Sequence, residues 1–143
     1  MKLLVINGPN INLLGLREPD IYGKKTYNDL LKIIESEEKN LGIKIDTFQS
    51  NWEGAIIDKI QDAFNKYNGI IINPAAYTHT SIAILDALKA VNIPTVEVHI
   101  SKVSEREGFR QINFIRNFVV NSFEGYGIEG YKMAIEYLYE KLR

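Results

Sequence analysis

The chain has 143 residues, of which 45% are apolar and 24% are charged, and its formal net charge is −1. This balance predicts one globular domain and gives no electrostatic reason to expect binding to nucleic acid or to an anionic membrane. The absence of cysteine excludes disulfides, thiolate nucleophiles and cysteine-ligated metals, and the two histidines fit no metal spacing. No apolar run reaches transmembrane length and no signal-peptide pattern is present, so we expect a cytoplasmic protein.

Short apolar runs and amphipathic segments alternate along the chain. The expected strands are residues 2–6, 43–49 (a weaker edge strand), 70–72, 94–100 and 118–123. The expected helices are residues 26–41, closed by Gly42, then 53–67, 81–91 and 128–142, with a short helix opened by the capping-box spacing of residues 104–107. Five such units predict an α/β fold with a doubly wound, five-stranded parallel sheet in the flavodoxin-like order 2-1-3-4-5.

The connection formed by residues 8–25 is unusually long for a strand-to-helix loop, which normally takes roughly 2–6 residues. Its apolar residues, which could dock on a surface, are Ile11, Leu13, Leu14, Leu16 and Ile21. It also carries Asn10, Arg17 and Tyr22, whose side chains can take part in chemistry. A long loop with these properties predicts a lid over an active site.

Polar side chains gather where the expected strands end. Asn10, Arg17 and Tyr22 follow strand one, and Asn73 and His79 follow strand three. Glu97 and His99 end strand four, with Ser101 just beyond. Ligands of doubly wound sheets bind beyond the carboxyl ends of the strands, at the point where the strand order reverses. We therefore expect these three loops to meet at one crevice.

Glu97 and His99 form the sharpest local signal. Because side chains alternate along a strand, both lie on one face, while Val96, Val98 and Ile100 lie on the other. A carboxylate beside an imidazole can orient the ring and favour its protonated form, which makes a general acid. A purely structural ion pair at a strand end is the alternative.

The other candidate residues also admit structural explanations. Tyr22 could be a packing residue, although a guanidinium such as Arg17 nearby would favour its phenolate. Arg17 alone could be a surface charge or an anion clamp. Asn73 could end a strand in a turn, and His79 could be only a residue at a helix start. Arg106 and Arg110, four residues apart, could be ordinary surface charges.

Residues 125–130 match the GxGxxG pattern of dinucleotide-binding proteins. Only one helix follows them, with no second βαβ strand and no acidic residue in the required later position. We therefore interpret these glycines as close helix–sheet packing.

Three blocks of sequence occur here in a specific combination. The first is GPNINLLG at residues 8–15, with REP at 17–19 and YG at 22–23; the second is NPAAYTHTS at 73–81; the third is EVHIS at 97–101, with Arg106 and FR at 109–110 downstream. In sequence and spacing they resemble the type II 3-dehydroquinate dehydratases, over essentially the whole chain.

The resemblance implies that residues 1–143 form a single catalytic domain that dehydrates 3-dehydroquinate to 3-dehydroshikimate, in the shikimate pathway. The elimination would be anti and would pass through an enolate, without a metal or an organic cofactor. Family members are homododecamers built from trimers.

The resemblance also implies a role for each matching residue. Tyr22, as phenolate, would be the base, and Arg17 would lower its pKa and help to close the lid. Asn10 would position a water at the enolate oxygen, and His99, oriented by Glu97, would protonate the departing hydroxyl. The substrate would bind to Asn73, His79 and Arg110 through its hydroxyls, to Ile100 and Ser101 through its carboxylate, and to Asp86 from a neighbouring subunit.

The chain departs from the family pattern at a few positions. Asn113 stands where serine is usual, Asn121 where glycine is usual, Leu85 where arginine is frequent and Tyr27 where leucine is common. We expect these changes to affect subunit contacts near Asp86 and packing near strand five, without touching the acid or the base. The alternative function is a flavodoxin-like nucleotide- or flavin-binding module, which the fold alone permits but which lacks a phosphate-binding loop.

Overall fold

The computed structural model describes residues 1–16 and 18–143. The strands are β1 (Lys2–Asn7), β2 (Lys44–Gln49), β3 (Gly69–Asn73), β4 (Thr95–His99) and β5 (Asn121–Glu124). The α-helices are α1 (Pro19–Tyr22), α2 (Tyr27–Leu41), α3 (Glu53–Asp62), α4 (Ile82–Val91) and α5 (Glu129–Leu142). Short 3₁₀ helices are η1 (Ile11–Leu13), η2 (Ala75–His79), η3 (Val103–Glu105) and η4 (Gly108–Gln111).

The strands form one five-stranded sheet in the order β2-β1-β3-β4-β5. Every neighbouring pair is parallel, and in register Asn7 of β1 lies beside Asn73 of β3. The predicted α/β fold with strand order 2-1-3-4-5 is therefore confirmed, and β2 is an edge strand as expected. The order reverses between β1 and β3, which places a ligand-binding crevice at their carboxyl ends.

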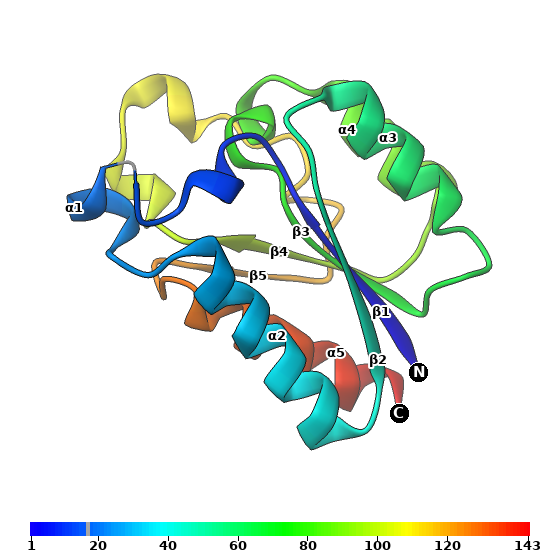
Figure 1. Cartoon of the computed structure of the whole chain (residues 1–143). Coiled ribbons are helices and arrows are strands. Elements are labelled where there is room, and N and C mark those ends of the chain that lie inside the picture. Colours follow the sequence, from blue (N-terminus) through cyan, green and yellow to red (C-terminus); the bar gives the residue numbers. More distant parts are fainter. Residues whose placement is uncertain (17) are drawn as a thin grey trace.

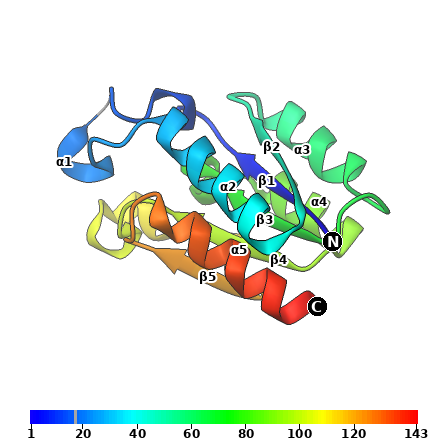
Figure 2. The ribbon, with the colours of Figure 1, turned by 60° about the horizontal axis from the view of Figure 1, so that its bottom comes forward.

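Helices cover both faces of the sheet (Figure 1). Helices α2 and α5 pack side by side on one face, and α3 and α4 pack together on the other, which Figure 2 shows from a second direction. In β1, Leu3 and Val5 belong to the core under α2 and α5, whereas Leu4 and Ile6 belong to the core under α3 and α4. Because both faces are buried, the strand is continuously apolar instead of alternating.

Local signals set most helix boundaries. Helix α2 begins after Thr26, which forms a reciprocal capping box with Asp29, and ends at Gly42, whose φ is 65°. The prediction that the third helix extends to residue 67 is wrong, because α3 ends at Asp62. Turns follow α3, and in them Asn65 has a φ of 62°. A left-handed residue cannot continue an α-helix, so the apolar periodicity beyond Asp62 belongs to these turns.

Two predicted elements are wrong in detail. The capping-box spacing at residues 104–107 opens no α-helix: Ser104 lies inside η3, and neither η3 nor η4 has a side-chain cap. The fifth strand begins at Asn121 instead of residue 118, because residues 118–120 lie in turns and bends where Phe118 and Val119 pack on the core. An apolar run alone does not distinguish a strand from a buried irregular segment.

A close backbone approach joins the loops after β1 and β3. The Gly8 amide donates to the Asn73 carbonyl at 2.8 Å. A Cβ atom on Gly8 would lie 2.4 Å from the Pro74 carbonyl oxygen, so only glycine fits there. This contact holds the start of the long loop against the end of β3.

None of the helices in the described part of the chain has the length and apolar character to cross a bilayer.

Candidate active site

A cavity of about 160 Å³ opens at the carboxyl ends of β1, β3 and β4. Its wall contains many of the residues predicted for the site: Asn10, Asn73, His79, His99, Ile100, Ser101 and Arg110, together with Arg106. The structure thus brings together residues from three separate loops, in the crevice where they were expected.

The remaining candidate residues lie elsewhere. Glu97 is fully buried behind the cavity wall. Asp86 lies on the exposed side of α4 and does not line the cavity of its own chain. Arg17 lies outside the described residues, and Tyr22 is described only as the last residue of α1.

The beginning of the long loop is attached to the core. Ile11 and Leu14 are buried in the core under α2, as expected of docking residues. Leu16 is 81% exposed, and Leu13 and Ile21 are also exposed, so the expectation that these three dock is wrong for this chain by itself. The difference arises because η1 turns Ile11 and Leu14 inward, whereas Leu13 falls on its outer side.

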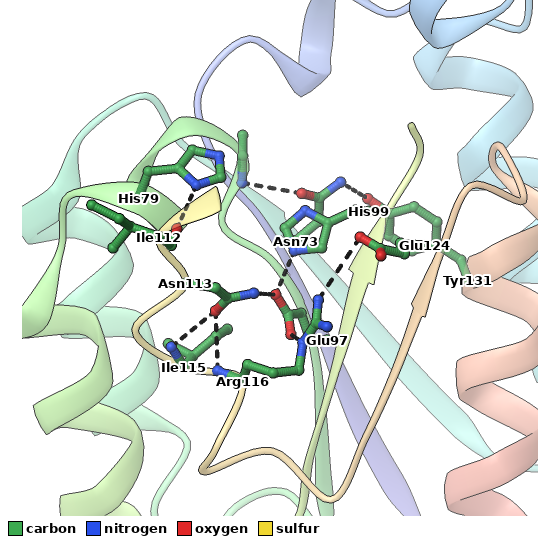
Figure 3. A network of polar contacts seen from close by, with 11 residues as sticks. Asn73, His79, Glu97, His99, Ile112, Asn113, Ile115, Arg116, Glu124 and Tyr131 are labelled. Atoms are coloured by element: carbon green, nitrogen blue, oxygen red, sulfur yellow. Dashed lines mark hydrogen bonds and ion pairs between the residues drawn. The ribbon is translucent and has the colours of Figure 1, made fainter. Parts of the chain in front are cut away.

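Asn73 is both a turn residue and part of the cavity wall. Its Oδ1 accepts from the Ala75 amide at 3.0 Å, and its Nδ2 donates to the Tyr131 hydroxyl at 2.9 Å (Figure 3). Tyr131 in turn donates to Oδ1 of Asn7 at 2.5 Å, and burial raises the pKa of Tyr131, so its phenol stays a neutral donor. The structural explanation of Asn73 as a turn residue is therefore correct, and the amide still lines the cavity.

The cavity wall contains two non-glycine residues with positive φ. Asn10 has a φ of 70° and Ala75 has a φ of 54°. The Asn10 amide is held by Oδ1 of Asn51 at 3.0 Å, and the Ala75 amide is held by Asn73. Such conformations cost of order 1–3 kcal/mol and are concentrated at functional sites, where the surrounding structure imposes them.

His79 is held in one tautomer. Its Nδ1 lies 2.7 Å from the Ile112 carbonyl oxygen, which can only accept, so Nδ1 carries the proton. Burial lowers the pKa of His79; the Ile112 carbonyl opposes this, and the charges of His99, Arg110 and Arg106 add to the lowering. A neutral His79 therefore offers the lone pair of Nε2 as a hydrogen-bond acceptor.

Glu97 and His99 form a buried hydrogen-bonded pair, in which Nε2 of His99 donates to Oε2 of Glu97 (Figure 3). Burial alone would raise the pKa of Glu97, but the hydrogen bond and charge of His99, with hydrogen bonds from Arg116 and Asn113, lower it to about 2. Glu97 is therefore ionised. Since Nε2 is occupied, Nδ1 is the ring nitrogen of His99 that a bound molecule can reach.

Asn113 and Arg116 were not recognised as part of this site from the sequence. Asn113 donates from Nδ2 to Oε2 of Glu97 at 2.6 Å, and Arg116 donates from Nε to Oε1 at 2.7 Å. The expectation was that Asn113, as a departure from the family pattern, affects packing near the fifth strand. The structure shows that Asn113 also contacts the carboxylate that holds His99. The only sequence signal was that departure itself, because neither residue has a spacing that relates it to Glu97.

Arg106 also belongs to the cavity, although its sequence context suggested a surface charge. Its side chain is only 12% exposed, and Nη1 donates to the Ser101 hydroxyl at 3.2 Å. Arg110 lies in η4 and donates from Nε to Oε2 of Glu107 at 2.7 Å. Two guanidinium groups beside a hydroxyl suit an anionic ligand. The described residues contain no group of three or more potential metal ligands.

Comparisons with known proteins agree over the full length. The family model described as dehydroquinase class II matches residues 1–139. A 3-dehydroquinate dehydratase of Clostridium acetobutylicum is 54% identical over 94% of both chains, and one of Clostridium perfringens is 53% identical over the whole of both. The solved type II dehydroquinase of Butyrivibrio crossotus, 51% identical, superposes with a TM-score of 0.94 over 96% of this chain and 97% of its own. The chain therefore belongs to the class II dehydroquinase family.

Proposed function

We propose that this chain dehydrates 3-dehydroquinate to 3-dehydroshikimate. The observation that carries the proposal is the buried Glu97–His99 pair, which presents an imidazole to a cavity that also holds Arg106 and Arg110. In a chain of this family the pair supplies a general acid, and Arg106, bonded to Ser101, supplies a positive charge beside the hydroxyl assigned to the substrate carboxylate.

The reaction uses a base from the long loop and an acid from β4. Tyr22, as phenolate with Arg17 beside it, removes a proton from the carbon next to the ketone and leaves an enolate. Asn10 positions a water that stabilises the enolate oxygen. The enolate collapses, the carbon–oxygen bond to the leaving hydroxyl breaks, and that hydroxyl takes a proton from His99 and departs as water. The elimination is anti, with the proton and the hydroxyl leaving from opposite faces, and the product is a conjugated enone.

Substrate binding uses the rest of the wall. Asn73, neutral His79 and Arg110 take the ring hydroxyls, while the backbone at Ile100 and the Ser101 hydroxyl take the carboxylate. The bond from Arg106 to the Ser101 oxygen orients that hydroxyl toward the cavity. Asp86, exposed on α4, reaches the site of a neighbouring subunit in a homododecamer of trimers. Residues 1–143 act as the single catalytic domain.

A direct assay tests this proposal. Purified protein treated with EDTA, with no cofactor added, is expected to convert 3-dehydroquinate to the enone, seen as new ultraviolet absorbance. Borohydride added with substrate should leave the enzyme active, because no lysine imine forms. Unchanged absorbance at high protein concentration would contradict the proposal, and a purified protein carrying flavin or nucleotide would favour the binding-module alternative.

Replacing His79 by alanine tests substrate binding separately from chemistry. Loss of one hydrogen bond to a ring hydroxyl should raise KM about tenfold and leave kcat within a few-fold of the wild type, since the bond is made equally in ground and transition states. Steady-state kinetics at pH 7 measure both constants. A fall in kcat at constant KM would show instead that His79 acts in the chemical step.

A further inference from the structure

The environment of Glu97 contains more donors than a simple acid–carboxylate pair requires. Figure 3 shows the Glu97 carboxylate contacted by His99, Asn113 and Arg116. His99 and Asn113 both donate to Oε2, and Arg116 donates to Oε1. Both carboxylate oxygens are thus engaged, which prevents rotation of the group about its Cγ–Cδ bond.

The segment that carries these two donors is itself fixed. Oδ1 of Asn113 accepts from the amides of Ile115 and Arg116 at 3.1 and 3.0 Å. Ile115 is 1% exposed and packs into the core under α3 and α4. Asn113 thereby uses one end of its amide to shape the turn and the other end to hold Glu97, and the turn places the Arg116 guanidinium on the remaining oxygen.

The charges also form a connected arrangement. Nη2 of Arg116 lies 3.9 Å from Oε2 of Glu124 at the end of β5, so its guanidinium stands between two carboxylates. Across the cavity the charged or titratable groups are Arg106, Arg110 and His79. The Arg116 guanidinium thus balances part of the negative charge of the Glu97 carboxylate that contacts His99.

We infer that Arg116, together with Asn113, is a positioning residue for the acid His99: the two side chains fix the Glu97 carboxylate in the orientation that directs Nδ1 of His99 at the leaving hydroxyl. The inference rests on the proposed function, because it assigns the acid step to His99. It adds Asn113 and Arg116 to the residues of the proposed function. Asn113 departs from the family pattern, and both residues lie in a segment without regular secondary structure.

Arg116→Met is the principal test. It removes the guanidinium and keeps an unbranched side chain on a position that is 40% exposed. We expect kcat for 3-dehydroquinate to fall about tenfold, with KM changed less than twofold, because only the proton transfer is impaired. The pH dependence of kcat/KM should also change, because the hydrogen bond from Arg116 is one of the contacts that lower the pKa of the neighbouring Glu97 carboxyl.

Two further variants separate this effect from a general loss of stability. Arg143→Met removes an exposed guanidinium that pairs with Glu140 at the end of α5, and it should leave kcat and the pH profile unchanged. Arg116→Lys keeps the charge but not the planar Nε donor, so it should restore part of kcat and most of the pH profile.

A spectroscopic measurement follows the contact without turnover. The chain has two histidines, so ¹⁵N-labelled imidazoles give only two sets of NMR signals. In the wild type, Nε2 of His99 should carry a proton bonded to Glu97, with a second proton on Nδ1 in the acid form of the ring, and His79 should carry its proton on Nδ1. In Arg116→Met the His99 Nε2 proton should exchange faster with water, while the His79 signals remain.

The outcomes separate the two proposals. Wild-type kcat, pH profile and His99 signals in Arg116→Met would overturn this inference, as would an equal fall in kcat in Arg143→Met. Should Arg116→Met not fold, Arg116→Lys decides, because identity with the wild type in all three measurements would overturn the inference. A wild-type protein without dehydratase activity contradicts the proposed function instead, and the NMR comparison still tests whether Arg116 holds the pair.

Discussion

Replacing Tyr22 by phenylalanine is expected to lower kcat for 3-dehydroquinate by about 1,000-fold. The change deletes one oxygen atom and with it the only group assigned to proton abstraction beside the ketone. Tyr22 ends the short helix α1, and its neighbours Ile21 and Gly23 are exposed. Circular dichroism and thermal unfolding should therefore match the wild type, while the ultraviolet assay reports the loss.

Tyr139→Phe is the matched control. Tyr139 lies in α5, where its ring is 5.6 Å from the Arg143 guanidinium, near the C-terminal end of the chain and away from the cavity. It should retain wild-type kcat and KM. If Tyr22→Phe kept more than a tenth of wild-type kcat, the assignment of Tyr22 as the base would be wrong.

Replacing Glu97 by glutamine is expected to lower kcat about 100-fold and also to weaken the fold. Glutamine keeps the size of the side chain but removes the charge that His99 and Arg116 both contact. The amide nitrogen of glutamine is itself a donor, so it would face either Nε2 of His99 or Nε of Arg116, which are also donors. The variant should therefore lose both the orientation of the acid and a set of buried, charge-assisted hydrogen bonds.

The stability effect has a definite pH dependence. The pKa of Glu97 is about 2 in the folded chain, against 4.5 for an unperturbed glutamate. A carboxyl whose folded pKa is lowered stabilises the fold above the unfolded pKa, and this contribution disappears as pH falls through the folded pKa. The wild type should be more stable than Glu97→Gln by about 3 kcal/mol at pH 7, and the difference should vanish between about pH 4.5 and 2.

Urea unfolding at a series of pH values measures this difference. Glu140→Gln changes an exposed glutamate that pairs with Arg143, and it should follow the wild type throughout because exposed pairs contribute little. A difference between wild type and Glu97→Gln that stays constant from pH 7 to pH 2 would show that charge on Glu97 does not stabilise the fold.

The fold could be predicted because its signals are local and repeated. Continuous apolar strands alternate with amphipathic helices, and right-handed crossovers allow few strand orders for such a series. Caps such as Thr26 and Gly42 mark helix ends through their own backbone contacts. Prediction failed where the chain is irregular, as at Ser104 and Phe118, because capping residues and apolar runs there serve 3₁₀ turns and loop packing.

The candidate site also has features that local sequence patterns predict and features that depend on tertiary contacts. The sequence alone determined the sheet, the crevice at its switch point, and the shared face of Glu97 and His99, because alternation along a strand is a property of neighbouring residues. Tertiary structure decided the partners of Glu97, since Asn113 and Arg116 are 16 and 19 residues away in a segment without periodicity. It likewise decided the His79 tautomer, which depends on the carbonyl of Ile112, 33 residues further along the chain. Such contacts arise only when a folded core brings separate segments together, and no local pattern records them.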